Sequence, residues 1–133
     1  MLFSTGGHRY AVDVDAVDEI AELLPEYPIP DSPRFLRGVV NIHGKLAAVL
    51  DLSLYLGTGP VRNGRNLLLL KMPGSGLAII VEQMERMIFA DEIISSEPGV
   101  AEFEVAIFAL PEGKAALLAT ESLVESVEKA VAS

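Results

Sequence analysis

The stretch LRGVVNIHGKLAAVLDL, at residues 36–52, decides the fold. It holds two short apolar runs on either side of the segment NIHGK, and this arrangement predicts a β-hairpin. We place its strands at about 38–43 and 46–52. One of the two histidines of the chain, His43, lies at the hinge, a few residues before Asp51. A histidine in this place suits an active site, a metal site or a surface shaped for another protein, and the hairpin alone does not distinguish them.

Further strand signals surround this hairpin. Residues 2–5 and 9–14 flank Gly6-Gly7, a pair that permits the positive φ angles of a tight hairpin turn. A helical turn is expected over 15–17, followed by a strand that ends near Pro25. The remaining predicted elements are strands at 66–72, 77–83, 86–90, 103–109 and 114–119, and a turn at 73–76.

Capping residues and prolines predict where helices begin. We expect Ser32 to cap a single helical turn that starts at Pro33, and Asp51 to cap the turn that follows it. Residues 91–101 are polar and predict an irregular loop. Thr120 is the expected N-cap of a C-terminal helix. The apolar stripe of that helix consists of Leu123, Val124, Val127 and Val131.

The composition fits one β-rich domain. A chain of 133 residues is long enough to form a single domain with its own core. Half of the residues are apolar but only 6% are aromatic, so the core must be built from aliphatic side chains. About nine short strands fall into two groups that divide near residue 60, a pattern typical of small barrels or a sandwich.

Charge and cysteine content exclude several classes of function. The formal net charge is −9, and such a surface repels phosphate backbones, so we expect no nucleic-acid partner. The chain has no cysteine, which excludes disulfides and thiolate metal sites. Its apolar runs are too short for a signal peptide or a membrane span. We therefore expect a cytoplasmic, soluble protein that does not insert into the membrane.

Few residue patterns in the chain suit catalysis. It has no phosphate-binding loop motif, no dinucleotide-binding glycine motif and no nucleophile elbow. His8 and His43 are isolated from each other in sequence, which is unfavourable for a metal site. Two alternatives to a protein-binding role stay open. One is a small β-barrel enzyme that uses Asp51 and His43 as acid and base, and the other is a ligand-binding module with an apolar pocket.

Three segments, taken in order, resemble the CheW-like domain of bacterial chemosensory systems. They are GGHRYAVDVDAVDEI at 6–20, PDSPRFLRGVVNIHGKLAAVLDLSLYLG at 30–57 and NLLLLKMPGSGLAIIVEQME at 66–85. Family members typically carry Tyr-Ala-Ile-Asp-Ile-x-x-Val-x-Glu-Ile, and this chain has YAVDVDAVDEI from Tyr10 onward. They also carry Gly-x-x-Asn-Leu-Arg-Gly-x-x-x-Pro-Val-Ile-Asp-Leu, and this chain has GVVNIHGKLAAVLDL from Gly38 onward. The joint spacing of these motifs is specific, whereas each motif alone is not.

The resemblance implies a fold, a role and a set of contact residues. The implied fold is a single CheW-like domain over 1–133, mainly β, made of two small five-stranded SH3-like β-barrels packed side by side. Subdomain 1 would be mainly 1–57 and subdomain 2 mainly 64–119, with a C-terminal helix at 120–132. The implied role is a non-catalytic adaptor, without a cofactor, that couples a chemoreceptor cytoplasmic tip to the regulatory domain of a CheA-type histidine kinase. The protein-interaction residues carried over from the family are Val17, Glu19, Asn41, His43 and Gly44.

The chain departs from the family pattern at positions that bear on this interface. Members usually have Arg where this chain has His43, and that Arg faces the glutamate that matches Glu19. Arg carries a permanent charge and a planar set of donors, whereas an ordinary His is mostly neutral at pH 7. We therefore expect a Glu19–His43 contact that is weaker than the family's and strengthens on mild acidification. Ala48 stands where the family has proline and Ala119 where it has aspartate, so the chain resembles a divergent member.

Overall fold

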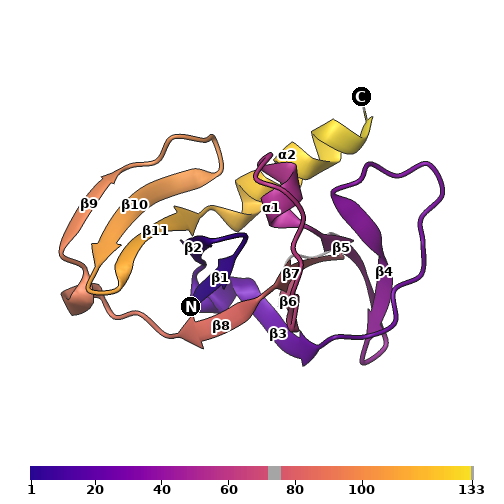
Figure 1. Ribbon diagram of the computed structural model, residues 1–133, viewed down its shortest axis with the longest axis horizontal. Coiled ribbons are helices and arrows are strands. Elements are labelled where there is room, and N and C mark those ends of the chain that lie inside the picture. The colour runs from indigo at the N-terminus through magenta and orange to yellow at the C-terminus, as the bar shows by residue number, and fades with distance from the viewer. Residues whose placement is uncertain (72–75, 133) are drawn as a thin grey trace.

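Two β-sheets lie next to each other and share one apolar core (Figure 1). The computed structural model describes residues 1–71 and 76–132. The first sheet has six strands in the order β8-β1-β2-β11-β10-β9, and the second has five in the order β3-β6-β7-β5-β4. Three side chains of the C-terminal helix α2, Leu123, Val124 and Val127, belong to the shared core. The mainly β fold with a C-terminal helix, predicted from the sequence, is confirmed.

The elements have the following bounds. The six-stranded sheet contains β1 (Leu2–Thr5), β2 (His8–Ala11), β8 (Gln83–Arg86), β9 (Ser95–Pro98), β10 (Glu104–Leu110) and β11 (Gly113–Leu118). The five-stranded sheet contains β3 (Val17–Glu22), β4 (Leu36–Ile42), β5 (Lys45–Leu50), β6 (Asn66–Leu70) and β7 (Leu77–Val81). The helical segments are η1 (Val14–Ala16), α1 (Leu52–Tyr55), η2 (Ala90–Glu92) and α2 (Thr120–Ala132).

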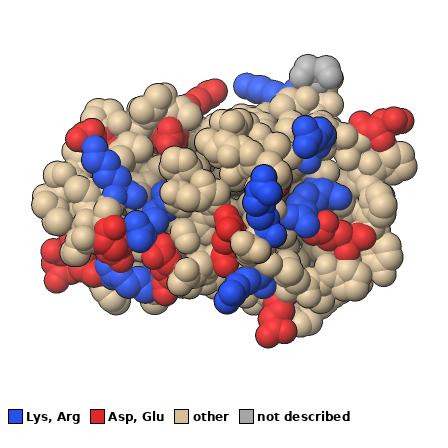
Figure 2. Space-filling model, in the orientation of Figure 1, with Lys and Arg blue, Asp and Glu red and all other residues tan. Residues whose placement is uncertain are grey.

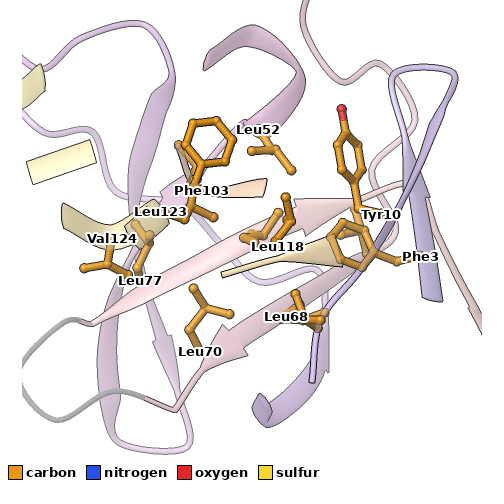
Figure 3. Packing of buried hydrophobic residues seen from close by; sticks show 14 of the residues in the cluster. Phe3, Tyr10, Leu52, Leu68, Leu70, Leu77, Phe103, Leu118, Leu123 and Val124 are labelled. Carbon is orange, nitrogen blue, oxygen red and sulfur yellow. The ribbon is translucent and has the colours of Figure 1, made fainter. Parts of the chain in front are cut away.

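The shared core explains the uninterrupted run of leucines in β6. Successive side chains of a strand point to opposite faces, so Leu68 and Leu70 enter the cluster between the two sheets. Leu67 and Leu69 enter a second cluster on the other face of the same strand. Figure 3 shows Leu68 and Leu70 in the same cluster as Phe3, which comes from the other sheet. A strand buried on both faces has a continuous apolar sequence, and β6 is such a strand.

The two closed barrels that the resemblance implies are not confirmed, because the described strands form open sheets. In the six-stranded sheet, the outer strands β8 and β9 do not pair with each other within the described residues. In the five-stranded sheet, the outer strands are β3 and β4, and a single bridge between Tyr27 and Val39 joins the segment after β3 to β4. Pro25 and Pro28 interrupt that segment, and proline has no N–H to donate, so a continuous ladder cannot form there.

Both sheets combine strands from before and after residue 60, where we expected the chain to divide into two groups of strands. β1 and β2 come from the first half of the chain but pair with β8 and β11 from the second half. In the other sheet, β3 and β5 from the first half pair with β6 and β7. Each sheet therefore contains strands from both 1–57 and 64–119, and the N-terminal hairpin lies in the centre of the six-stranded sheet.

Both predicted hairpins are confirmed, but the predicted helix start at Ser32 and Pro33 is wrong. The chain makes only a turn here, in which the Leu36 N–H donates to the Pro33 carbonyl at 3.0 Å. Leu36 then pairs with Leu50 in the adjacent strand. One turn is too short to propagate as a helix, and the strand ladder takes up the backbone groups instead.

Three further predictions need correction. The segment 91–101 is not wholly irregular, because β9 pairs with β10 from Ala109↔Ser95 to Ala106↔Pro98. All four β9 residues are exposed, so backbone pairing forms this strand without an apolar signal. The strand predicted at 86–90 ends at Arg86 instead. At the start of α2, the carbonyl of Ala119 accepts from the Leu123 N–H, so Ala119 and not Thr120 occupies the cap position.

The rest of the expected helix stripe is mostly buried. Leu123, Val124 and Val127 lie in the core, whereas Val131 is exposed. Within the described residues, none of the helices has the length and apolar character needed to cross a membrane. Residues 72–75, which include most of the turn predicted at 73–76, lie outside the described residues.

Candidate protein-interaction surface

The turn between β4 and β5 consists of His43 and Gly44, both with positive φ. The φ angle is 50° at His43 and 86° at Gly44, as in a type I′ hairpin turn. Glycine adopts this conformation without strain, whereas a residue with a Cβ atom is disfavoured there. The Asn41 Oδ1 accepts a hydrogen bond from the Gly44 N–H at 2.7 Å. Three of the predicted site residues therefore form one restrained hairpin tip, residues 41–45.

Two side-chain contacts join the hairpin tip to β3, at the opposite edge of the same sheet. The His43 Nδ1 contacts the Glu19 Oε1, and the Lys45 Nζ donates to the Asp18 Oδ2 at 2.9 Å. The hydrogen bond that Lys45 donates to Asp18 raises the pKa of Lys45 above its ordinary value, and the negative charges of Asp18 and Glu19 add to that effect. The tip is thus held between its own strands and the far edge of the sheet.

The contact between His43 and Glu19 remains open to solvent. The His43 side chain is 79% exposed and the Glu19 side chain 25% exposed. An ion pair in such a position contributes little to folding, because water screens it and two side chains must be ordered. Its accessible imidazole is instead available to a docking partner. The structure thus brings together the two residues whose contact the family resemblance implied.

Val17 lies on β3 with its side chain half-buried against the shared core. It therefore leaves only part of its side chain accessible to a partner. Two neighbouring apolar side chains are much more accessible, since Ile20 is 40% exposed and Leu46 is 68% exposed. Large apolar side chains left in water near a shaped turn are typical of binding surfaces.

An open hollow of about 270 Å³ adjoins the hairpin tip. Its lining combines apolar side chains with a few charges and comprises Asp18, Lys45, Leu46, Leu69, Leu70, Lys71 and Gly76. Leu69 and Leu70 are almost fully buried, so Leu46 forms the accessible apolar part of the wall. This hollow and Ile20 extend the surface that the predicted residues form.

Phe35 and Leu36 both pack against the shared core. The Phe35 ring lies 4.8 Å from the Tyr55 ring in an edge-to-face arrangement. Such a contact fixes α1 against the start of β4. These two residues therefore support the docking surface without forming it.

Asp51 is a buried cap and lies away from His43. It is 2% exposed, and its two carboxylate oxygens accept from the Leu54 and Val61 N–H groups, each at 2.9 Å. The prediction that it caps the following turn is confirmed. The strand β5 separates Asp51 from the hairpin tip, a length of about 20 Å. The two residues cannot act as an acid–base pair on one substrate.

The structure also bears on two other sites considered from the sequence, a metal site and an apolar ligand pocket. His8 lies on β2 in the six-stranded sheet, whereas His43 lies at the tip in the five-stranded sheet. No cluster of three or more His, Asp or Glu side chains that could hold a metal ion occurs among the described residues. The side chains of the shared cluster pack between the sheets.

Sequence reasoning missed Ile20 and Leu46 as surface residues, and the period of the strands could have found them. In β5, Ala47 and Val49 point into the second cluster, which turns Leu46 to the other face. In β3, the exposed residues alternate with half-buried ones, and Ile20 falls on the exposed side. The Lys45–Asp18 contact could not be predicted from the sequence, because it forms only when the two edges of the curved sheet approach each other.

Comparison with known proteins places these features in a family. Residues 1–128 match the family described as the CheW-like domain. A probable chemotaxis protein CheW of Rhizobium etli is 25% identical over 99% of this chain and 90% of its own length. The chemotaxis protein CheW of Treponema pallidum is 27% identical over 75% of this chain and 63% of its own. The crystal structure of the scaffolding protein TtCheW from Thermoanaerobacter tengcongensis has a TM-score of 0.72 and 23% identity, over 88% of this chain and 80% of that one. The chain belongs to the CheW-like domain family.

Proposed function

We propose that this chain is a non-catalytic adaptor in a chemotaxis or chemosensory-like pathway. It couples the cytoplasmic tip of a chemoreceptor to the regulatory domain of a CheA-type histidine kinase, and it works in the cytoplasm. Membership of the CheW-like family supports this role, as do the chemotaxis names of its relatives and the scaffolding name of the similar structure. The separation of Asp51 from His43 also supports an adaptor over the enzyme alternative.

The observation that carries the proposal is the restrained and accessible hairpin tip. Its backbone is fixed by the Asn41–Gly44 hydrogen bond and by the contacts of His43 and Lys45 with β3. A surface that is already ordered loses little conformational entropy when a partner docks. Rigidity combined with exposure is what a docking surface requires, whereas a purely structural turn needs only the first.

The chemistry of the surface suits a partner helix. Ile20 and Leu46 provide exposed apolar contacts, and the charged side chains of Asp18, Glu19 and Lys45 lie between or beside them. An amphipathic helix docks by placing its apolar face against such contacts while polar side chains at the rim fix its orientation. We assign Val17, Glu19, Asn41, His43 and Gly44 to this interface together with Ile20 and Leu46.

A binding experiment with point variants tests the proposal. A receptor cytoplasmic tip and a CheA regulatory domain, each immobilised separately, are used to capture the chain. Ile20→Asp and Leu46→Asp should each weaken capture of at least one partner by about tenfold, because each places a charge in an apolar contact. Glu19→Lys should do the same by reversing a charge beside His43.

The matched control is Val105→Asp, because Val105 is 56% exposed on β10 of the other sheet. All four variants are checked for unchanged thermal unfolding. If the three surface variants bind both partners as tightly as the unchanged chain, the hairpin tip is not the interface. If neither partner binds the unchanged chain, the adaptor role itself is wrong.

A further inference from the structure

A second surface, rich in arginine, lies at the end of β4 away from the hairpin tip. Arg34 and Arg37 lie at the start of β4, and Arg62 and Arg65 lie in the loop between α1 and β6. All four are exposed, and Figure 2 shows Lys and Arg side chains gathered over these segments on one face of the molecule. We call these four residues the basic surface. It is unexpected in a chain with 19 Asp and Glu against 10 Lys and Arg.

Most of this positive charge is not neutralised within the chain. The guanidinium groups of Arg34, Arg62 and Arg65 form no ion pair with any residue in the described parts of the chain. Arg37 differs, because its Nε lies 3.2 Å from the Glu26 Oε1. Arg86, by contrast, is paired with Glu92 and Glu112. The basic surface therefore has spare charge and spare hydrogen-bond donors.

An open hollow of about 380 Å³ lies between the two arginine segments. Its lining is formed by Arg34, Leu36, Arg37, Asp51, Leu54, Pro60 and Val61. Asp51 contributes little free charge to it, because this carboxylate is buried and bound to two backbone N–H groups. The hollow thus has basic residues at its rim and apolar side chains within it.

We propose that the basic surface binds an acidic peptide segment of a partner protein, in which carboxylates flank an apolar side chain. Guanidinium groups bind carboxylates through two parallel hydrogen bonds, so arginine suits this partner better than lysine. The apolar side chain would enter the hollow. Each exposed contact contributes modestly, so several arginines must act together. This surface is separate from the hairpin tip, and the proposal does not depend on the adaptor role.

The charge of the whole molecule favours a short peptide over an extended polyanion. A membrane or nucleic acid would meet the net charge of −9 over a wide area and be repelled. A short segment senses mainly the charges within about 8 Å, the screening length at physiological salt. Two arginines, Arg34 and Arg37, line the hollow, and the carboxylate that lines it with them is the buried Asp51.

The test uses a fluorescein-labelled peptide, Gly-Glu-Glu-Leu-Glu-Glu-Gly, and its neutral counterpart Gly-Gln-Gln-Leu-Gln-Gln-Gly. Binding to the full chain is measured by fluorescence anisotropy at low and physiological salt. The acidic peptide should bind at least about tenfold more tightly than the neutral one, with an affinity that falls as salt rises. The double variant Arg34→Glu/Arg62→Glu, which changes one arginine that lines the hollow and the arginine next to Val61 in its wall, should lose about tenfold or more in affinity for the acidic peptide.

The matched control is Lys71→Glu/Lys114→Glu, which changes the net charge equally but away from the hollow. It should change the affinity less than about twofold. Equal binding of the two peptides overturns the proposal, as does an equal loss in the control variant. The proposal is also overturned if vesicles of phosphatidylcholine and phosphatidylserine bind the chain more tightly than the acidic peptide does. The four substituted positions are exposed or lie at strand ends, and unchanged circular dichroism confirms that both variants fold.

Discussion

In each sheet, a cluster of charged side chains links strands that are far apart in the strand order, and these two clusters differ in exposure. In the six-stranded sheet, Arg86 at the end of β8 donates to both oxygens of Glu112 at 3.0 Å and to Glu92 at 2.6 Å. Their side chains are 25–37% exposed. In the five-stranded sheet, His43 meets Glu19 while 79% exposed.

This difference distinguishes a contact whose polar groups are all used within the fold from a contact whose side chain stays accessible. The bidentate Arg86–Glu112 pair satisfies its own donors and acceptors and holds the β10–β11 turn near β8. The His43 imidazole leaves much of its surface free, beside exposed Leu46. Both clusters tie a sheet together, but the second is the more exposed one, as the proposed docking role requires. The following predictions break or sharpen this comparison, from the largest expected effect to the smallest.

Leu68→Ala should cause the largest loss of stability, because it removes support from both sheets at once. Leu68 is fully buried in the shared cluster. The cavity left by a truncated core leucine costs about 2–5 kcal/mol. Urea unfolding followed by circular dichroism measures the loss. A cost equal to that of Leu46→Ala, whose side chain is exposed, would show that the sheets do not depend on a common core.

Asp51→Ala should affect the five-stranded sheet and its neighbouring loop. It removes the acceptor for the Leu54 and Val61 N–H groups, and both donors lose their partner. The expected cost is about 1–3 kcal/mol in the free energy of unfolding. Asp51→Asn keeps one acceptor oxygen and should cost less. Hydrogen exchange at the Leu54 and Val61 amides localises the effect, and unchanged exchange there would contradict the assignment.

Arg86→Met should produce a stability loss that depends on pH. Hydrogen bonding from Arg86 lowers the pKa of Glu112, and the Phe89 N–H together with Arg86 lowers that of Glu92. Carboxyls with a lowered folded-state pKa stabilise the fold above their ordinary value of 4.5, and this contribution is lost as pH falls through the folded-state pKa. The difference in the free energy of unfolding between wild type and variant should therefore be present near about pH 6 and shrink near about pH 3. A difference in the free energy of unfolding that does not change with pH would show that the Arg86 ion pairs with Glu92 and Glu112 do not cause it.

His43→Asn should have the smallest effect on folding. Asparagine tolerates the positive φ of a type I′ turn better than histidine, which offsets the lost contact with Glu19. The net change in the free energy of unfolding should stay within about 0.5 kcal/mol. Affinity for the receptor tip or the kinase domain should fall nonetheless. A stability loss as large as that of Asp51→Ala would mean that the tip serves the fold rather than a partner.

The sequence predicted local elements well where apolar period and turn residues agreed. The hairpin at 36–52 and the capping role of Asp51 follow from short-range chemistry, and the structure has both. β9 could not be predicted, because its Ser-Ser-Glu-Pro sequence carries no apolar pattern and only pairing with β10 forms it. The helix expected at Ser32 failed because long-range strand pairing overrode a local capping signal.

The residues of the two proposed surfaces were much harder to predict from the sequence than the strands and helices were. The link between Glu19 and His43 was expected only through the family resemblance. Arg34 and Val61, the residue before Arg62, are distant in sequence, and the fold brings them to the wall of one hollow. Side chains from distant segments can form one surface without leaving any signal in the sequence.

The most direct test of the central claim is whether both partners bind this chain at the same time. The chain, a receptor cytoplasmic tip and a CheA regulatory domain are mixed and examined by sedimentation velocity, with a different chromophore on each. An adaptor predicts one boundary that contains all three chromophores, and loss of the receptor chromophore or the kinase chromophore from it in Leu46→Asp. Boundaries that never contain more than two of the components, with the partners competing for the chain, would contradict the account.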